Sequence, residues 1–115
     1  MRKVKTKVLL NGKATGISVS WDNGQFTLIV TDNGILACGI FDPEILEQFS
    51  MAGALCRGTP EKSLKEPEDL LSAKVAEVSP AARKLGIKKG MSGKHALAIL
   101  TSPANKNGVK ALHVT

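Results

Sequence analysis

Aromatic residues are scarce in this chain of 115 residues, which has one Trp, three Phe and no Tyr. Proteins that bind single-stranded nucleic acid commonly stack the bases on several aromatic side chains. This scarcity argues against nucleic acid as a partner, although the chain is basic.

Cysteine and histidine are also sparse, with two of each. Cys38 and Cys56 form no Cys-x-x-Cys pair, and two cysteines do not make a disulfide scaffold in a chain of this length. We therefore expect a reduced, cytoplasmic protein. The histidines, His95 and His113, show no metal-ligand spacing relative to the cysteines. We expect no metal and no other cofactor.

Long hydrophobic runs are missing. Residues 1–5 are charged and lack the apolar segment of a signal peptide, and no run approaches the roughly 18 apolar residues that cross a membrane. We expect no membrane association. The length suits one domain, residues 1–115, with a compact core over about 3–100 and a tail or edge strand over 101–115.

Acidic residues are absent after Glu77. The net charge is +6, all ten acidic residues lie between Asp22 and Glu77, and residues 78–115 carry only basic charges. This asymmetry favours an anionic ligand, but it is equally compatible with head-to-tail contact between copies of the chain.

Asn-Gly pairs at residues 11–12, 23–24 and 33–34 divide the first part of the chain. Asn-Gly readily supplies the positive φ angles of a tight hairpin turn. Between these pairs, apolar residues alternate with polar ones, which is typical of strands. The apolar positions are Ile17, Val19 and Trp21 in one segment and Phe26, Leu28 and Val30 in the next. We predict a four-stranded antiparallel meander over residues 3–41.

The fourth strand, residues 35–41, has no polar residue on either face. Such a strand is covered on both sides, here by helices on one and by more of the chain or a second subunit on the other. Cys38 and Gly39 lie within it, where a side chain is held rigidly and a ligand can approach the backbone. An all-apolar strand gives no register, so the pattern leaves open whether Cys38 faces the core or a cleft.

Two capping residues followed by proline predict helix starts, at Asp42-Pro43 and Ser79-Pro80, and residues 66–69 stand at the head of another short helix. The first helix presents an apolar stripe and ends near Gly53; the stripe is Ile45, Leu46 and Phe49. The second is short and the third ends at Gly86. Residues 90–93 form a loop before a last helix over 94–100. Residues 54–58 are a short strand or a link, and 74–78 a fifth strand. The predicted fold class is α+β.

Several of these features together resemble the YunC-like family of small uncharacterised bacterial and archaeal proteins. They are Asn33-Gly34, Cys38-Gly39, Asp42, Leu85-Gly86-Ile87, Gly90-Met91-Ser92-Gly93 and Ala96-Leu97. The resemblance covers about residues 8–100. It implies a compact α+β domain and supplies no activity.

The loop from Gly90 to His95 is the leading candidate for a ligand site. If Ser92 or Gly93 opens the last helix, its backbone amides and nearby lysines suit a phosphate or carboxylate. The loop does not have the spacing of a P-loop. We expect it to line one anion site together with the Cys38-Gly39 strand. The candidate ligand-binding residues are Gly39, Arg57, Gly90, Ser92, Gly93, Lys94 and His95. The alternative is an ordinary serine N-cap with surface lysines.

Two other functions remain open. A cysteine-dependent enzyme would use Cys38 or Cys56 as a thiolate, with His95 as the base and Arg57 or His95 lowering the pKa of the thiol. Cys56, beside Arg57, is expected to be the more reachable of the two. The alternative is that both are small buried hydrophobes. The third function is a homo-oligomeric interaction module without a ligand, whose covered strand packs between subunits.

Overall fold

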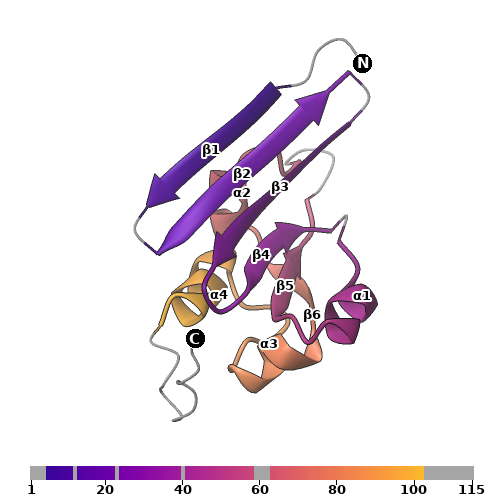
Figure 1. Ribbon diagram of the computed structural model, residues 1–115, viewed down its shortest axis with the longest axis vertical. Coiled ribbons are helices and arrows are strands. Elements are labelled where there is room, and N and C mark those ends of the chain that lie inside the picture. Colours follow the sequence, from indigo (N-terminus) through magenta and orange to yellow (C-terminus); the bar gives the residue numbers. More distant parts are fainter. Residues whose placement is uncertain (1–4, 12, 23, 40, 59–62, 103–115) are drawn as a thin grey trace.

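The computed structural model describes residues 5–11, 13–22, 24–39, 41–58 and 63–102, and the predicted C-terminal tail or edge strand lies almost wholly outside them. Within these residues, six strands form one sheet in sequence order (Figure 1). They are β1 (Lys5–Asn11), β2 (Ala14–Trp21), β3 (Gly24–Thr31), β4 (Ile35–Cys38), β5 (Gly53–Cys56) and β6 (Val75–Val78). Strands β1 to β4 are antiparallel, which confirms the meander. Strand β5 is parallel to β4 and antiparallel to β6.

The turn between β3 and β4 is closed by Thr31 and Gly34. The Thr31 amide and hydroxyl both donate to the Gly34 carbonyl oxygen, at 2.9 and 2.7 Å. Asn33 reaches further, because its Nδ2 donates to the carbonyl oxygens of Leu100 at 2.8 Å and Ser102 at 2.9 Å. A residue predicted only as part of a turn therefore also holds the end of the last helix against the sheet.

In the described part of the chain, four short helices follow the meander: α1 (Pro43–Gln48), α2 (Pro67–Ser72), α3 (Pro80–Lys84) and α4 (Gly93–Leu100). The predicted caps are confirmed at α1, α3 and α4. The Asp42 carboxylate accepts from the Glu44 amide, the Ser79 hydroxyl from the Ala82 amide, and the Ser92 hydroxyl from the His95 amide. These caps satisfy amides that a helix start leaves without an intrahelical partner.

The predicted end of the first helix at Gly53 is wrong. Helix α1 ends at Gln48, and Ser50 then adopts a left-handed conformation with φ of 56°. Gly53 opens β5, where it is buried against Leu46, whose Cδ1 would lie 2.4 Å from a Cβ at this position. Gly53 therefore allows α1 to pack closely on the sheet, and it does not end the helix.

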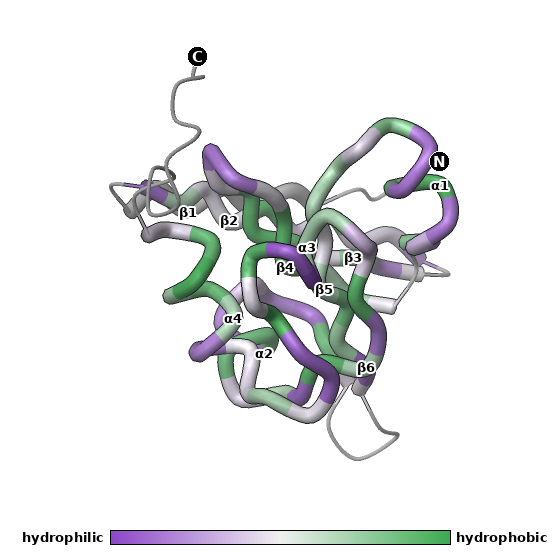
Figure 2. Tube along the Cα trace, turned by 90° about the horizontal axis from the view of Figure 1, so that it is seen from below, coloured by the Kyte–Doolittle hydropathy of each residue, from purple (hydrophilic) through white to green (hydrophobic). Residues whose placement is uncertain are grey.

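The two faces of the sheet are covered unequally. The prediction of a fourth strand over residues 35–41 is too long, because β4 ends at Cys38 and Gly39 beyond it is exposed. Over its four residues β4 is buried on both faces, as predicted, with Leu36 and Cys38 in the larger core and Ile35 and Ala37 in a smaller one. Figure 2 shows α2 and α4 on one side of β4 and β5 and α1 on the other. Helix α1 contributes Leu46 to the smaller core.

The apolar stripe predicted for the first helix is only partly correct. Leu46 is buried, whereas the side chains of Ile45 and Phe49 are 48% and 69% exposed. Helix α1 ends at Gln48, so Phe49 lies beyond the helix as its C-cap and is not part of the packed face. None of the helices in the described part of the chain is both long and apolar enough to span a membrane.

Candidate functional site

An open cleft lies where the two parallel strands end. Strands β4 and β5 run side by side from the Ile35–Gly53 pair to the Cys38–Cys56 pair, so both reach the same edge of the sheet. Gly39 follows β4, and Arg57 and Gly58 follow β5. In open sheets the carboxyl ends of parallel strands commonly form the ligand site.

Two adjoining hollows make up this cleft. The first has a volume of about 560 Å³ and is lined by Gln25, Cys38, Gly39, Arg57, Gly58, Ser63 and Leu64. The second has a volume of about 340 Å³ and is lined by Arg57, Gly58, Ser63, Leu64, Asp69, Ser72, Ala73 and Lys74. Because Arg57 borders both hollows, we call them together the Arg57 cleft.

The side chain of Arg57 is exposed, but an ion pair holds it in one orientation. Its Nη2 donates to Oε2 of Glu77 on β6, and the two side chains are 63% and 37% exposed. A Cβ at Gly39 would lie 3.5 Å from Cγ of Arg57, so the aliphatic part of the arginine lies beside the glycine. A guanidinium has five N–H donors. One side of Arg57 is thus held by Glu77 while other donors can face the cleft.

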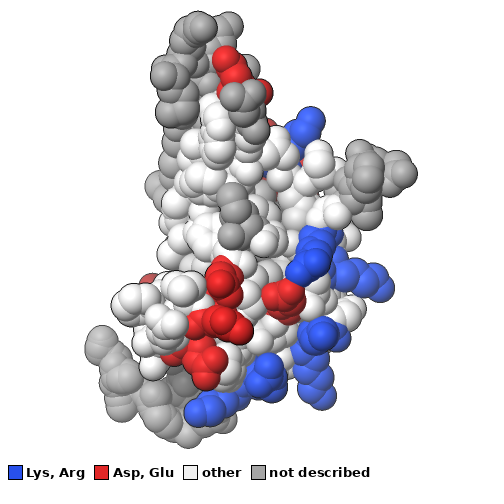
Figure 3. Space-filling view, turned by 90° about the vertical axis from the view of Figure 1, so that its right-hand side faces the viewer, with Lys and Arg blue, Asp and Glu red and all other residues white. Residues whose placement is uncertain are grey.

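The acidic residues at the cleft already have partners. Glu77 accepts from Arg57. Oδ2 of Asp69 accepts from the backbone amides of Lys65 and Glu66, at 3.0 and 2.9 Å, as part of the cap of α2. Figure 3 shows Lys and Arg side chains gathered along one side of the molecule, with Asp and Glu side chains beside them. Lys74 adds a second basic residue to the wall of the cleft.

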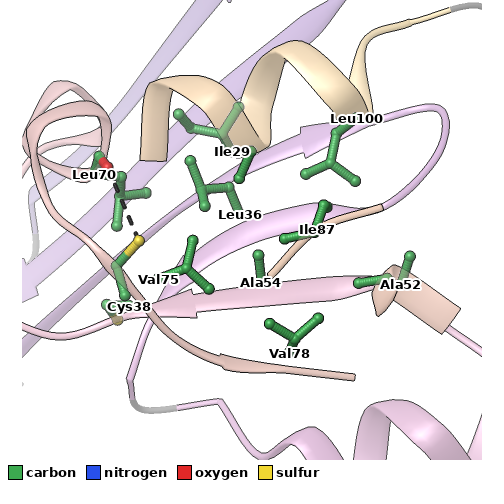
Figure 4. Packing of buried hydrophobic residues seen from close by; sticks show 13 residues of the cluster. Ile29, Leu36, Cys38, Ala52, Ala54, Leu70, Val75, Val78, Ile87 and Leu100 are labelled. Carbon is green, nitrogen blue, oxygen red and sulfur yellow. Dashed lines mark hydrogen bonds between the residues drawn. The ribbon is translucent and has the colours of Figure 1, made fainter. Parts of the chain in front are cut away.

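The two cysteines differ in accessibility, in the opposite sense to the prediction. Both are free thiols; Cys38 is 8% exposed and borders the cleft, whereas Cys56 is fully buried. The Cys56 thiol donates weakly to the Leu70 carbonyl oxygen at 3.9 Å, the bond dashed in Figure 4. Burial, and secondarily the charge of a nearby Cys38 thiolate, raise the pKa of Cys56 to about 11. Any thiol chemistry at this cleft would therefore use Cys38.

The predicted loop from Gly90 to His95 does not line the Arg57 cleft. Its amides donate within the protein: Gly90 to Val75 O and Gly93 to Ala73 O, both at 2.8 Å, and His95 to Ser92 Oγ at 3.1 Å. Ser92 pairs with Lys74 in an isolated bridge, so the loop lies next to the cleft without facing it. The structure thus separates the two halves of the predicted site.

Gly93 has a packing role at the start of α4. A Cβ there would lie 1.7 Å from the Leu70 carbonyl oxygen, so only glycine allows α4 to approach α2 this closely. Lys94 and His95 are exposed. Of the predicted ligand-binding residues, the structure brings together Gly39 and Arg57. Within the described residues, no three His, Cys, Asp or Glu side chains gather as metal ligands would.

Other lining residues were not found from the sequence. Ser63, Leu64 and Lys74 come from a loop and a strand start that carry no motif. Gln25 on β3 binds this loop, because its Nε2 donates to the Leu64 carbonyl oxygen at 3.1 Å. This contact joins residues that are far apart in the sequence, so no local sequence pattern predicts it.

The fold and the cleft define an α+β domain with a mixed sheet and a cleft, bordered by Arg57, at the end of its parallel pair. Residues 37–100 match the model of a family described as a domain of unknown function, DUF1805, and the chain belongs to this family. This confirms the predicted YunC-like resemblance.

A relative and a solved structure agree with this assignment. The chain is 30% identical over 93 residues to the uncharacterized protein YunC of Bacillus subtilis, which covers 80% of this chain and 91% of that protein. The crystal structure of TA1206, a protein of unknown function from Thermoplasma acidophilum, superposes with a TM-score of 0.71 at 24% identity, covering 85% of this chain and 93% of that one. The latter likeness shows the fold, and the activity has to be argued from the site.

Proposed function

We propose that this protein binds a small anionic molecule, carrying a carboxylate or phosphate group, in the Arg57 cleft. The observation that carries this proposal is the position of Arg57. It borders both hollows at the carboxyl ends of the parallel strands, beside Gly39 and oriented by Glu77. A planar guanidinium matches carboxylate and phosphate oxygens through paired hydrogen bonds.

The surroundings of Arg57 suit a ligand of mixed character. Lys74 adds positive charge and Ser63 a hydroxyl, whereas Leu64 offers an apolar surface. Gly39 and Gly58 let a ligand approach the backbone closely, since neither has a side chain. Specific pockets typically combine an apolar lining with a few convergent polar groups. This proposal replaces the glycine-rich loop with Arg57 as the main anion contact.

The ion pair with Glu77 lowers the attraction of Arg57 for an anion without abolishing it. Exposed ion pairs contribute little free energy, and both partners here are solvent-accessible. An anion can therefore compete for part of the guanidinium. Glu77→Gln removes a negative charge next to the ligand and is expected to strengthen anion binding, whereas Arg57→Ala is expected to weaken it.

The test is a titration of the full chain with inorganic phosphate and simple carboxylates, followed by amide chemical shifts in NMR. We expect shifts at residues 38–39, 57–58 and 63–64. Arg57→Ala should weaken binding about tenfold or more, through loss of a charge-assisted contact. Lys84→Ala, an exposed lysine on α3, removes the same charge away from the cleft and should have little effect.

A second variant separates the two candidate anion sites. If the loop at residues 90–95 binds the anion, Lys94→Ala weakens binding and the shifts centre on that loop. Unchanged binding in Arg57→Ala would refute the proposal, provided that its thermal unfolding midpoint matches that of the wild type.

A further inference from the structure

The two cysteines of this chain lie side by side in the sheet. The sequence contains no others, yet the fold pairs Cys38 with Cys56 at the last position of the parallel strands β4 and β5. Both side chains belong to the larger core, whereas Ala37 and Leu55, one residue earlier, belong to the smaller one. Because side chains alternate along a strand, the two thiols lie on the same face of the sheet. A shift of one residue in register would have put them on opposite faces.

The spacing of paired strands suits a disulfide. Neighbouring strands lie about 4.8 Å apart, and the two Cα atoms of a disulfide are usually about 4.4 to 6.8 Å apart. Both thiols are free. Besides burial, which is the main cause, the charge of Cys38 raises the pKa of Cys56, so the two sulfurs are near neighbours. Paired side chains point the same way, so the bond requires a small approach of the strands, and a strained bond of this kind is easily reduced.

The pair stands where the sheet can make this adjustment. Strand β4 ends at Cys38 and is followed by Gly39, and the pairing of β5 with β6 is irregular beside Cys56. Oxidation would also remove the weak hydrogen bond from the Cys56 thiol to the Leu70 carbonyl oxygen. That oxygen still accepts from the Ala73 amide at 3.3 Å, so it keeps a partner. A disulfide can therefore form without orphaning this buried acceptor.

The two thiols differ in access, which gives each a different role. Cys38 is 8% exposed and borders the larger hollow of the Arg57 cleft, whereas Cys56 is 0% exposed. A small neutral oxidant such as hydrogen peroxide can reach Cys38 from this hollow, and the core shields Cys56. An accessible cysteine beside a second, resolving cysteine is the usual arrangement at a redox-sensitive site.

We propose that Cys38 and Cys56 form a reversible disulfide in the presence of hydrogen peroxide, with Cys38 as the attacking thiol and Cys56 as the resolving thiol. The Cys38 thiolate attacks one peroxide oxygen and the O–O bond breaks. The leaving hydroxide takes the proton that the Cys38 thiol released, which gives water and a sulfenic acid on Cys38. The Cys56 sulfur then attacks the Cys38 sulfur, and the sulfenic hydroxyl leaves with the Cys56 proton as a second water. Two thiols are thus oxidised by two electrons while one peroxide is reduced to two waters.

The second step should be the slower one. Because the pKa of Cys56 is about 11, its thiol keeps its proton until it attacks, and the thiolate is the better nucleophile. The Cys38 sulfenic acid should therefore accumulate briefly before the disulfide closes. The reaction needs no bound anion, so it does not depend on the proposed function of the Arg57 cleft.

The test is oxidation of the reduced full chain by hydrogen peroxide at neutral pH, followed by alkylation in denaturant and mass spectrometry. We expect the mass of the single chain to fall by two hydrogen atoms, and digestion to yield one peptide pair joined through Cys38 and Cys56. Dithiothreitol should restore both thiols. The same reaction in urea is the control, because unfolding separates the two cysteines, and there the disulfide should close at least about tenfold more slowly.

Two variants test the separate roles. Cys56→Ala should stop at the Cys38 sulfenic acid, which dimedone traps. In Cys38→Ala, Cys56 should be oxidised at least about tenfold more slowly than Cys38 is in the wild type, because the core covers it. Thermal unfolding shows whether each variant is folded, and the wild-type measurements decide the question if one is not.

Three results would overturn the proposal. One is a wild-type chain in which Cys38 proceeds to sulfinic acid while Cys56 stays free. Another is a disulfide that forms only between chains. The third is a disulfide that closes no faster in the native chain than in urea, since the fold would then contribute nothing to the pairing. None of these results bears on anion binding, so failure of the disulfide and failure of the anion site are distinguishable.

Discussion

Cys38 and Cys56 lie opposite each other at the last paired position of the parallel strands β4 and β5, yet of these two buried thiols only Cys38 borders the Arg57 cleft. Cys38 is 8% exposed and borders the Arg57 cleft. Cys56 is fully buried below Leu70. Two thiols at the same level of the sheet therefore have different chemical environments, because both belong to the larger core but only Cys38 also borders the cleft.

This difference predicts unequal alkylation. In the native protein near pH 8, iodoacetamide should modify Cys38 many times faster than Cys56, because burial and the raised pKa keep Cys56 a protonated, inaccessible thiol. Mass spectrometry of each cysteine-containing peptide measures both rates. In denaturant the two rates should converge. Equal native rates would contradict the burial of Cys56.

The pKa of Cys56 also predicts how stability depends on pH. Its ordinary value is 9.0, and the folded protein raises it to about 11. Well below pH 9 both states hold the proton, and this thiol does not change the stability. Between pH 9 and 11 the unfolded state releases the proton first, so the free energy of unfolding falls, by at most about 3 kcal/mol. Urea denaturation across this range measures the slope, which Cys56→Ala should reduce; an unchanged slope in that variant would assign the effect to other groups.

Gly93→Ala should destabilise the fold by about 3 kcal/mol, because the added Cβ would overlap the Leu70 carbonyl oxygen. Urea denaturation gives this difference. Lys94→Ala, one residue further on at an exposed position, should change stability by less than about 0.5 kcal/mol. A stable Gly93→Ala protein would show that α4 can move away from α2 without loss.

Ser79 links three parts of the chain. Its buried hydroxyl accepts from the Gly53 amide at 2.9 Å and the Ala82 amide at 3.3 Å, and donates to the Met51 carbonyl oxygen at 2.9 Å. Ser79→Ala should cost about 2 to 3 kcal/mol, since it leaves a buried amide without a partner and removes a cap. Ser92→Ala removes a cap at an exposed position and should cost about 1 kcal/mol. Thermal denaturation of both variants measures these losses of stability. Equal losses in Ser79→Ala and Ser92→Ala would argue against a stabilising hydrogen bond between the Gly53 amide and Ser79.

Asn33→Ala should loosen the C-terminal end of α4 while leaving the turn intact. The side-chain amide donates to Leu100 and Ser102, whereas the turn is closed by Thr31 and Gly34. Hydrogen exchange should speed up at residues 99–102, with a stability loss of about 1 kcal/mol or more. Asn33→Asp is the matched control, because it keeps the side-chain size but removes the donor and should behave like the alanine variant.

Features with local causes could be predicted from the sequence. The Asn-Gly pairs lie where the first strands end or begin and so locate the hairpins, although Asn33 does not adopt the positive φ of a type I′ turn and Asn11 and Gly24 belong to strands. Asp42, Ser79 and Ser92 place helix starts because each side chain caps an amide two or three residues away. The apolar run of β4 predicted a strand covered on both faces, which the structure confirms.

Features that depend on distant segments could not be predicted from the sequence. The amides of the Gly90–Gly93 loop looked available to a ligand, but Val75 and Ala73 supply their acceptors. Cys56 looked reachable beside Arg57, but Leu70 of α2 covers it. The sequence alone thus determined the order of strands, turns and capped helices, because these follow from interactions within a few residues. Only the tertiary structure decided that β5 runs parallel to β4 and that Arg57 stands at their common end, because these depend on which segments pack together.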